Sequence, residues 1–511
     1  MTTLADLIER NARMRPDAIA TVFGARVLTY NAFATQIEAV AGGLAAEFDV
    51  ARGDRIAHLG YNSDAFLVLL FACARLGAIL VPLNWRLAAP EHGYVLAHAE
   101  PRLLVVEPIF AERAAGLVAG LAAGLAATRV FVCDPALAGG GLAAVAPAHP
   151  GRSSPSGGDM GDPLLLVYTS GTTGRPKGAL LTQAALLSNA VNSWHMHGLT
   201  ARDHILAALP MFHVGGLNIQ TVPALLAGAR VTILDRFAPD TVLDALAPSR
   251  AERPSLLVLV PATMEAVLAH PQFSRAHVGH LRCLTTGSTI VPETLVQRFA
   301  ELGTRVIQVY GATETGPIVI YERFDTARHG DGTTGTAGLL NDARIVDDAG
   351  CAVADGVAGE IAVRGPNILA GYWRDDDATA AALADGWFLT GDIGVRDAAG
   401  HFSVRDRKKN VIISGGENVY PAEIERVLGA APGIAECAVV GRPDAKWQEV
   451  AVAFVVATPG TALDLVAINT YLAANLARFK LPQAIIVRDA LPKTALGKVQ
   501  HFALKAELGR R

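Results

Sequence analysis

Residues Tyr168–Gly178 read YTSGTTGRPKG and follow directly on the apolar run PLLLV, Pro163–Val167. The stretch holds four Ser or Thr residues, three glycines and two cations. After a strand, such a loop can turn backbone N–H groups and hydroxyls toward phosphate oxygens, because glycine permits the φ angles and the close approach. Gly178 follows Lys177, where a Walker loop has a Ser or Thr for Mg²⁺, so this is not a Walker loop. The stretch predicts a phosphate-binding loop after a buried strand.

The fold class follows from the pattern around this loop. Apolar strand-like runs alternate with helical patterns for most of the length, which is typical of an α/β fold with buried, largely parallel strands. Examples of such runs are RIAHLGY at 55–61, LLVVE at 103–107, RVTILD at 230–235 and RVIQVY at 305–310. The most apolar segment, Phe66–Leu83, contains Arg75, Gly77 and Pro82, so we expect a buried helix, a turn at Gly77 and a strand instead of a membrane span.

Composition excludes several classes of protein. With 511 residues, 51% of them hydrophobic and 18% charged, the chain should form more than one domain. The net charge of −4 gives no electrostatic reason to expect nucleic acid or stable membrane insertion. The five cysteines are scattered without a C-x-x-C, which predicts a reducing compartment, and the N-terminus lacks signal-peptide features. We therefore expect a cytoplasmic protein.

The sequence pattern changes twice toward the C-terminus. After Ile345, short alternating segments with turns predict small β-hairpins. The charged stretch RDRKKN, Arg405–Asn410, then precedes an α/β pattern of about a hundred residues, an ordinary domain size. We therefore expect an N-terminal domain over residues 1–407 and a C-terminal domain over residues 408–511.

Four further motifs accompany the phosphate loop in a fixed order. They are VYGATETG at Val309–Gly316, LTGD at Leu389–Asp392, DRKKNVIISGGENVYPAEIE at Asp406–Glu425 and LPKTALGKV at Leu491–Val499. Together the five motifs resemble the adenylate-forming superfamily of acyl- and aryl-CoA synthetases, luciferases and peptide-synthetase adenylation domains. The resemblance covers nearly the whole chain. It implies a large N-terminal domain of mixed, mainly parallel sheets flanked by helices, with a β-subdomain, and a small mobile C-terminal α+β domain.

The resemblance also implies an ATP site with Mg²⁺. Contacts to the β- and γ-phosphates would come from Thr169, Ser170, Gly171, Thr172, Thr173, Gly174 and Lys177. In the second motif Tyr310, beside Gly311, would stack on adenine, Thr313 would bind the α-phosphate or the acyl carboxylate, and Glu314 would hold Mg²⁺. Asp392 and Arg407 would bind the ribose hydroxyls. From residue chemistry alone, Tyr310 could equally be a core residue, Glu314 a helix-start cap, and Asp392 and Arg407 solvated charges.

The implied reaction activates a carboxylic acid. Attack on the α-phosphorus of ATP gives an acyl-adenylate and pyrophosphate, and a thiol then displaces AMP. Lys498 of the last motif is the candidate to stabilise the negative charge of the first step. The second step needs other groups, and a rotation of the C-terminal domain about Lys409 would supply them.

Coenzyme A is the expected thiol because no carrier-protein segment is found in the sequence. The residues implied for CoA binding are Gly415 and Gly416, Trp447, and the cations Arg478 and Lys480. Position 481 is Leu, where some relatives carry a further basic residue, so either the two cations meet the CoA phosphates or CoA binds differently. Simple core packing remains an alternative for Trp447.

The acyl pocket is implied by the segment PMFHVGG, Pro210–Gly216. His213, Val214, Gly215, Gly287 and Ser288 would line it, with walls added by Asn192–Leu199 and Thr285–Pro292. We expect Gly215, Gly216 and Gly287 to leave volume unfilled, and His213 either to act between the carboxylate and thiol paths or to be a packed core residue. Because the walls offer nothing conspicuous to pair with a second carboxylate, a monocarboxylic fatty or aromatic acid is expected.

Three functions remain open on the sequence. The first is an ATP-dependent acyl-CoA ligase acting on a small carboxylic acid. The second is a stand-alone adenylating enzyme that loads a carrier protein or oxidises its adenylate, and the third is a non-catalytic relative that binds nucleotide or acyl groups. Joint presence of Lys177, Glu314, Asp392, Arg407 and Lys498 speaks against the third. The sequence leaves a homodimer open.

Overall fold

The computed structural model describes residues 3–120, 128–134, 157–169, 175–287, 291, 293–327, 332–407, 412–419, 421–492, 499 and 501–508. The chain forms two compact units. The first comprises Met1–Trp85, Leu96–Val167 and Gly178–Arg405, and the second comprises Arg86–Val95, Tyr168–Lys177 and Asp406–Arg511. The last segment of the second unit begins two residues before the predicted C-terminal domain. Two short stretches from earlier in the chain belong to this unit as well, and nothing local in their sequence indicates it.

The first unit contains a sheet whose inner strands are parallel. Its nine described strands lie in the order β15 (Thr336–Ala337), β14 (Ile320–Tyr321), β13 (Val306–Tyr310), β12 (Cys283–Gly287), β11 (Leu256–Val258), β9 (His204–Ala207), β10 (Arg230–Ile233), β1 (Ile19–Phe23) and β2 (Arg26–Thr29). Pairing is parallel from β13 to β1, and antiparallel at both edges. Parallel strands are buried on both faces, which explains their continuous apolar sequence.

A second sheet contains the strands that precede and follow the phosphate-loop motif in the sequence. Its seven described strands lie in the order β18 (Gly371–Tyr372), β8 (Lys177–Thr182), β7 (Pro163–Thr169), β4 (Ile79–Pro82), β3 (Arg55–Leu59), β5 (Leu103–Val106) and β6 (Arg129–Val132). The motif begins at the end of β7 and ends at the start of β8. These two sheets confirm the expected α/β class with mainly parallel strands.

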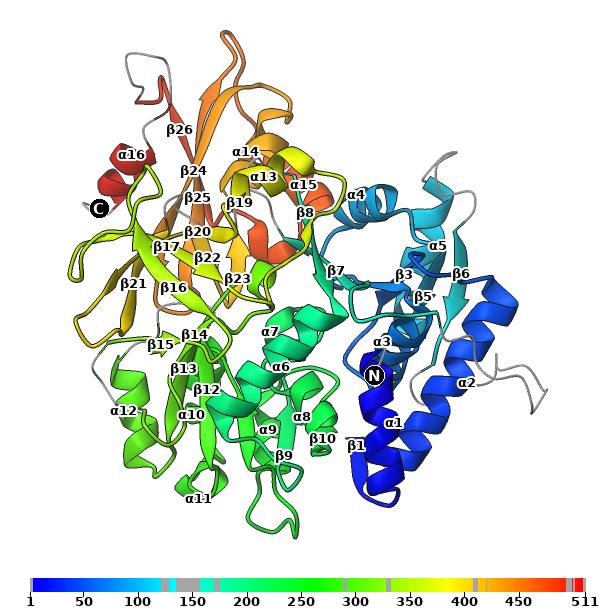
Figure 1. The fold of residues 1–511 in the computed structure, drawn as a ribbon. Helices are drawn as coiled ribbons and strands as arrows, with labels where there is room; N and C mark the ends of the chain where they lie inside the picture. The colour runs from blue at the N-terminus through cyan, green and yellow to red at the C-terminus, as the bar shows by residue number, and fades with distance from the viewer. Residues whose placement is uncertain are drawn as a thin grey trace. The chain divides into compact units, whose positions relative to one another are not determined.

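Helices cover the sheets through two apolar cores. The larger core includes α1 (Leu4–Met14), α2 (Tyr30–Phe48), α3 (Asp64–Leu76), α6 (Gln183–His197) and α8 (Thr221–Ala227); the smaller includes α9 (Pro239–Ala245), α10 (Pro261–Leu268), α11 (Arg275–Val278) and α12 (Glu293–Glu301). Figure 1 shows α1 and α2 running side by side in blue. Further helices of this chain region are α4 (Ala89–Ala99), α5 (Ala111–Gly120), α7 (Val214–Asn218) and the single turns η1 (Pro108–Phe110) and η3 (Thr313–Thr315).

Helix α3 shows how the sequence sets these elements. It begins where the Ser63 hydroxyl accepts a hydrogen bond from the Phe66 N–H, and it ends at Gly77, whose φ of +72° suits glycine. Every residue of α3 is buried. The expected helix, turn and strand over this apolar segment are therefore confirmed, since β4 follows. Among the described helices, none combines the length and apolar character that a membrane crossing requires.

An antiparallel sheet follows Ile345, as expected from the hairpin pattern. It comprises β16 (Asp342–Val346), β17 (Gly359–Arg364), β20 (Trp387–Arg396) and β19 (Leu383–Ala384), with β21 (Phe402–Arg407) paired to β20, and α13 (Asp376–Ala382) precedes β19. The LTGD motif lies inside β20. This sheet is the predicted β-subdomain, and it brings the motif into the first unit.

The second unit has a sheet of its own. Its described strands are β23 (Glu417–Val419), β22 (Ile412–Ser414), β25 (Gln448–Ala457), β24 (Ile434–Asp444) and β26 (Ala484–Arg488), accompanied by α14 (Pro421–Gly429), α15 (Leu465–Asn475), η4 (Arg478–Lys480) and α16 (His501–Leu508). Two apolar clusters, one on each face of β24 and β25, supply its core. All five cysteines of the chain are free thiols.

Candidate active site

The predicted nucleotide residues Tyr310 and Asp392 meet in the first unit. Tyr310 ends β13 of the large parallel sheet, and Asp392 lies in β20 of the β-subdomain. The Tyr310 hydroxyl donates a hydrogen bond to Asp392 Oδ2 at 2.7 Å. Asp392 is buried, and its own N–H donates to Thr390 Oγ1 at 3.1 Å. An aromatic ring and a buried carboxylate are thus joined by a hydrogen bond.

The turn after β13 has a backbone that only glycine allows at its first position. A Cβ on Gly311 would lie 1.8 Å from the carbonyl oxygen of Pro317, so the chain folds back directly over this residue. Thr315 is buried, and its hydroxyl accepts a hydrogen bond from the Ala312 N–H at 2.8 Å. The packed turn fixes the direction in which the following residues leave the sheet.

Glu314 lies on this turn with Thr313, in the 3₁₀ turn η3. Its carboxylate accepts a hydrogen bond from the Tyr372 hydroxyl at 3.0 Å, and its backbone carbonyl accepts one from the Leu369 N–H at 2.7 Å. The carboxylate is half-buried. A carboxylate oriented by a neutral hydroxyl group is a suitable hard ligand for Mg²⁺.

Several predicted residues fall outside the described chain. Of the phosphate loop, Thr169 ends β7 and Lys177 begins β8. Arg407 ends β21, and only its backbone is described. The predicted residues without a description are Ser170, Gly171, Thr172, Thr173, Gly174, Ser288, Lys409 and Lys498.

The acyl-pocket glycines differ in the space around them. A Cβ on Gly216 would lie 2.2 Å from the Pro210 carbonyl oxygen, and one on Gly287 would lie 2.3 Å from that of Val309. These two glycines therefore allow backbones to approach, and the position that a Cβ would take at each of them is already filled. At Gly215 the nearest atom, Ile219 Cδ1, would be 4.0 Å away, so a Cβ there would make only an ordinary van der Waals contact.

His213 precedes α7 and is half-buried, with its ring centroid 4.5 Å from that of Phe212. Part of the His213 side chain is therefore exposed to solvent. Val214 is buried in the larger core. Of the segment Pro210–Gly216, the half-buried positions are Pro210, His213 and Gly215, and the other four are buried.

A buried polar network joins the two predicted walls of the acyl site. His197 Nδ1 lies 2.8 Å from the Ser193 carbonyl oxygen, and His197 Nε2 lies 2.9 Å from Thr285 Oγ1. Burial lowers the pKa of His197 to about 4, so the ring is neutral near pH 7. Gln220 Nε2 completes the network, 3.1 Å from both His197 Nε2 and Thr285 Oγ1.

Sequence reasoning did not single out Gln220. It lies in the run LNIQTVPALL, Leu217–Leu226, where polar side chains are few and each must find a partner when buried. That contrast is the signal that could have found it. No periodicity shows that its partners are His197 and Thr285, because they come from separate elements.

Trp447 and Gly415 form a contact in the second unit. The Trp447 side chain is 44% exposed, which rules out simple core packing. A Cβ on Gly415 would lie 2.8 Å from Trp447 Cε3, and the Gly415 N–H donates to the Trp447 carbonyl at 3.0 Å. Gly416 follows with a positive φ of +80°. An exposed aromatic ring on a glycine turn can receive a flat or flexible ligand group.

The two cations predicted for CoA phosphates have different environments. Arg478 is exposed, whereas Lys480 is only 4% exposed and its ammonium lies 2.5 Å from Glu91 and 2.8 Å from Glu423. Burial alone would lower the pKa of Lys480, but the two carboxylates raise it above its usual value. In this structure Lys480 is a buried ion-pair partner and does not offer its charge to a phosphate. The motif RFK gave no sign of Glu91, which precedes it by 389 residues.

Comparison with known proteins assigns the family. The AMP-binding enzyme family matches residues 8–373, and the AMP-binding enzyme C-terminal domain matches residues 423–498. Indoleacetate–CoA ligase of Aromatoleum aromaticum is 46% identical over 99% of this chain and 98% of its own. Feruloyl-CoA synthase of an Amycolatopsis species is 40% identical over 98% and 97%.

A solved structure shares the architecture. It is a double mutant of o-succinylbenzoate CoA synthetase from Bacillus subtilis, bound with a product analogue, with a TM-score of 0.85, 28% identity and 98% coverage of both chains. The resemblance to adenylate-forming enzymes is thereby confirmed, and so is the fold class. The chain belongs to the AMP-binding enzyme family.

Proposed function

We propose that the protein is an ATP-dependent acyl-CoA ligase, an acid–thiol ligase that converts an aromatic monocarboxylic acid to its CoA thioester and releases AMP and pyrophosphate. The observation that carries the proposal is the joining of Tyr310 and Asp392 beside the Glu314 turn, in a chain of the AMP-binding enzyme family. The aromatic preference is supported by the two relatives, which act on indoleacetate and on feruloyl groups, both aryl acids.

In the first half-reaction the chain's own residues bind and orient ATP. The Tyr310 ring offers a face to adenine while Asp392 accepts from ribose hydroxyls, and Lys177 at the start of β8 adds positive charge for the phosphates. The substrate carboxylate attacks the α-phosphorus and forms a new P–O bond. The bond from the α-phosphorus to the oxygen that bridges the α- and β-phosphates breaks, and pyrophosphate leaves with that oxygen. Lys498 is proposed to stabilise the charge of that step.

Mg²⁺ is proposed to accompany ATP, and it would neutralise phosphate charge when bound. The described residues contain no group of three or more His, Cys, Asp or Glu side chains able to hold a metal. Mg²⁺ commonly uses one or two carboxylates together with substrate phosphates, so a single Glu314 fits this mode. Tyr372 holds Glu314 by its hydroxyl and sets the direction of the carboxylate.

In the second half-reaction CoA is the proposed thiol. The thiol attacks the acyl carbonyl, the bond to AMP breaks, and the thioester forms. Trp447 and the Gly415–Gly416 turn are the proposed contacts for CoA, with Arg478 as the exposed cation. A reducing, cytoplasmic location is proposed from the sequence, in which the five cysteines are scattered without a C-x-x-C.

The test uses purified full-length protein with ATP, Mg²⁺ and a panel of indole-3-acetate, ferulate, benzoate and graded fatty acids. We expect pyrophosphate release with aromatic acids and, on addition of CoA, the thioester and AMP in equal amounts. Absence of pyrophosphate with every acid would indicate a non-catalytic relative. Pyrophosphate without thioester would indicate a different acceptor, such as a carrier protein.

A further inference from the structure

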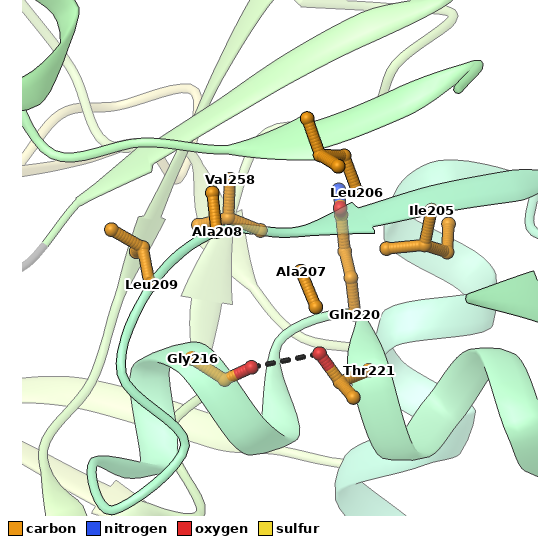
Figure 2. Close-up of a pocket in the computed structure, with 9 residues that line it drawn as sticks. All are labelled: Ile205, Leu206, Ala207, Ala208, Leu209, Gly216, Gln220, Thr221 and Val258. Carbon is orange, nitrogen blue, oxygen red and sulfur yellow. Dashed lines mark hydrogen bonds between the residues drawn. The ribbon is translucent and has the colours of Figure 1, made fainter. Parts of the chain in front are cut away.

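A small cavity lies in the first unit between β9, α7 and the start of α8. It is lined by Ile205, Leu206, Ala207, Ala208, Leu209, Gly216, Gln220, Thr221 and Val258, and it has room for about one water molecule. Figure 2 shows Gln220 reaching from the start of α8 to Leu206 on β9. Only two of the lining side chains are polar, so the cavity is apolar apart from what they offer.

The first of these polar side chains, Thr221, already makes a hydrogen bond. Thr221 Oγ1 donates to the Gly216 carbonyl oxygen at 2.8 Å, as the dashed line in Figure 2 marks. The second is Gln220, which is 1% exposed. Its Oε1 has no hydrogen-bond partner within the described parts of the chain.

The orientation of the Gln220 amide is fixed by His197. The Ser193 carbonyl can only accept, so His197 Nδ1 carries the ring proton. A neutral imidazole with Nδ1 protonated leaves Nε2 as an acceptor. The atom of Gln220 that faces Nε2 must therefore be the amide nitrogen, which donates to it and to Thr285 Oγ1.

A consequence follows for the other end of the amide. Turning the amide over would place two acceptors, Oε1 and Nε2, against each other. Oε1 is therefore held as a hydrogen-bond acceptor at the cavity, and a buried acceptor without a partner is costly. The missing partner must be a donor of about the size of a water molecule, surrounded on its other sides by apolar groups.

The cavity adjoins the acyl site. Gly216 lines it, and Gly215 next to it on α7 could carry a Cβ without a clash. Gln220 donates a hydrogen bond to Thr285, which lies two residues before Gly287 on β12. A ring hydroxyl or a ring N–H edge, projecting from a substrate ring beside α7, has the size and polarity that the cavity requires.

We propose that Gln220 Oε1 accepts a hydrogen bond from a ring N–H or O–H of the substrate, so that this chain selects aromatic acids bearing such a donor. The inference rests on the proposed function and narrows its substrate class. Gln220 is a specificity-determining residue in this scheme and takes no part in the chemistry. His197 is a positioning residue, because it acts by fixing the Gln220 amide.

The first experiment needs only the wild-type protein and two matched substrate pairs. Indole-3-acetate is compared with benzofuran-3-acetate, in which an oxygen acceptor replaces the N–H, and 4-hydroxycinnamate is compared with 4-methylcinnamate. We expect kcat/KM for pyrophosphate release to favour the donor-bearing acid of at least one pair by about fivefold or more, since an unpaired buried acceptor is penalised by at least that factor. Smaller ratios in both pairs overturn the proposal.

Two variants then assign the selectivity to the acceptor. Gln220→Leu removes Oε1 while Thr285 still donates to His197, so the ratio should fall to within about twofold of unity. Thr221→Ser keeps the hydroxyl that bonds Gly216 and enlarges the same cavity by a methyl group, so the ratio should persist. A ratio unchanged in Gln220→Leu, or lost equally in both variants, overturns the role of Gln220.

The outcomes separate this inference from the proposed function. If no acid releases pyrophosphate, the proposed function itself fails. If donor-bearing and donor-free acids react equally well, or fatty acids are preferred, the ligase assignment stands and the role of Gln220 is refuted. A crystal structure with indole-3-acetate provides an independent check: we expect the indole nitrogen within 3.2 Å of Oε1, and a water molecule there instead would refute the contact.

Discussion

The hydroxyl of Tyr310 donates to the carboxylate of Asp392 across 2.7 Å, although the two residues are 82 positions apart and belong to different sheets. The bond fixes the Tyr310 ring at its far end and uses one lone pair of a buried carboxylate. The two groups proposed to contact adenine and ribose therefore have a relative position that is set before ATP binds.

The first prediction concerns this bond. Tyr310→Phe keeps the aromatic face but removes the hydrogen bond from Tyr310 to Asp392, so we expect KM for ATP to rise about three- to tenfold with little change in kcat. Steady-state pyrophosphate release at varied ATP measures it. Tyr310→Ala, which also removes the ring, should raise KM for ATP further. Equal KM values in wild type and Tyr310→Phe would show that the bond does not organise the site.

The second prediction tests Glu314 as the ligand of Mg²⁺. Glu314→Gln keeps the size of the side chain and its hydrogen bond with Tyr372, but it removes the negative charge. We expect adenylation to slow on the order of a hundredfold and to require more Mg²⁺, with the thermal midpoint nearly unchanged. Magnesium titrations of the rate provide the measurement. An active but destabilised variant would make Glu314 a structural residue.

The third prediction separates the half-reactions by means of Lys498. If Lys498 stabilises only the transition state of adenylation, Lys498→Ala should slow pyrophosphate release on the order of a hundredfold or more. Thioester formation from chemically prepared acyl-adenylate and CoA should stay within a few-fold of wild type. Parallel loss in both assays would indicate that the motif around Lys498 has a docking role.

The fourth prediction uses the contrast between two neighbouring cations. Lys480→Met leaves Glu91 and Glu423 buried without their shared ammonium, which should cost about 3–5 kcal/mol of stability. Arg478→Ala should leave the thermal midpoint unchanged and raise KM for CoA. A Lys480→Met protein with normal stability and weakened CoA binding would restore Lys480 as a phosphate ligand.

The fifth prediction is a loss of stability on acidification. Burial lowers the pKa of His58, His197 and His204 to about 4, while unfolded histidines bind protons near pH 6.5. Between these values the unfolded chain holds more protons than the folded one, so the free energy of unfolding falls as the pH falls. Glu107 opposes this, because burial raises its pKa to about 7 and the folded state keeps that proton.

Two substitutions should shift this pH dependence in opposite directions. His204→Gln removes one buried histidine, so the loss of stability between pH 7 and pH 5 should become smaller. Glu107→Gln removes the opposing group, so the loss should become larger. Thermal midpoints measured across this range provide the comparison. A common direction of change in both variants would contradict the assignment of these pKa shifts.

Local patterns predicted the elements of this molecule better than its contacts. The strand runs and the helix, turn and strand around Gly77 follow from hydrophobic periodicity and from turn residues, which act within a few positions. The hydrogen bond from Tyr310 to Asp392 requires that two separate sheets come together. The motifs indicated that both residues bind nucleotide, but not that they bind each other.

Charge and space were the properties that sequence reasoning could not supply. Lys480 was expected to face CoA, but two carboxylates from distant segments hold it in the interior. Gly216 and Gly287 were expected to leave room, but neighbouring carbonyl groups occupy the positions where their side chains would be. The role of Gln220 depends on which nitrogen of His197 is protonated, and the Ser193 carbonyl beside the ring determines this.

The unequal surroundings of Gly215 and Gly216 bear on how the substrate range of such a protein can be redesigned. A side chain at Gly216 must displace backbone, whereas a Cβ at Gly215 would meet only Ile219 Cδ1, at 4.0 Å. A library restricted to position 215, in small steps from Ala to Leu, would therefore alter the depth of the acyl site while leaving the Gly216 cavity and the nucleotide side intact. Substrate length and donor recognition can then be tuned as separate variables, each by its own residue.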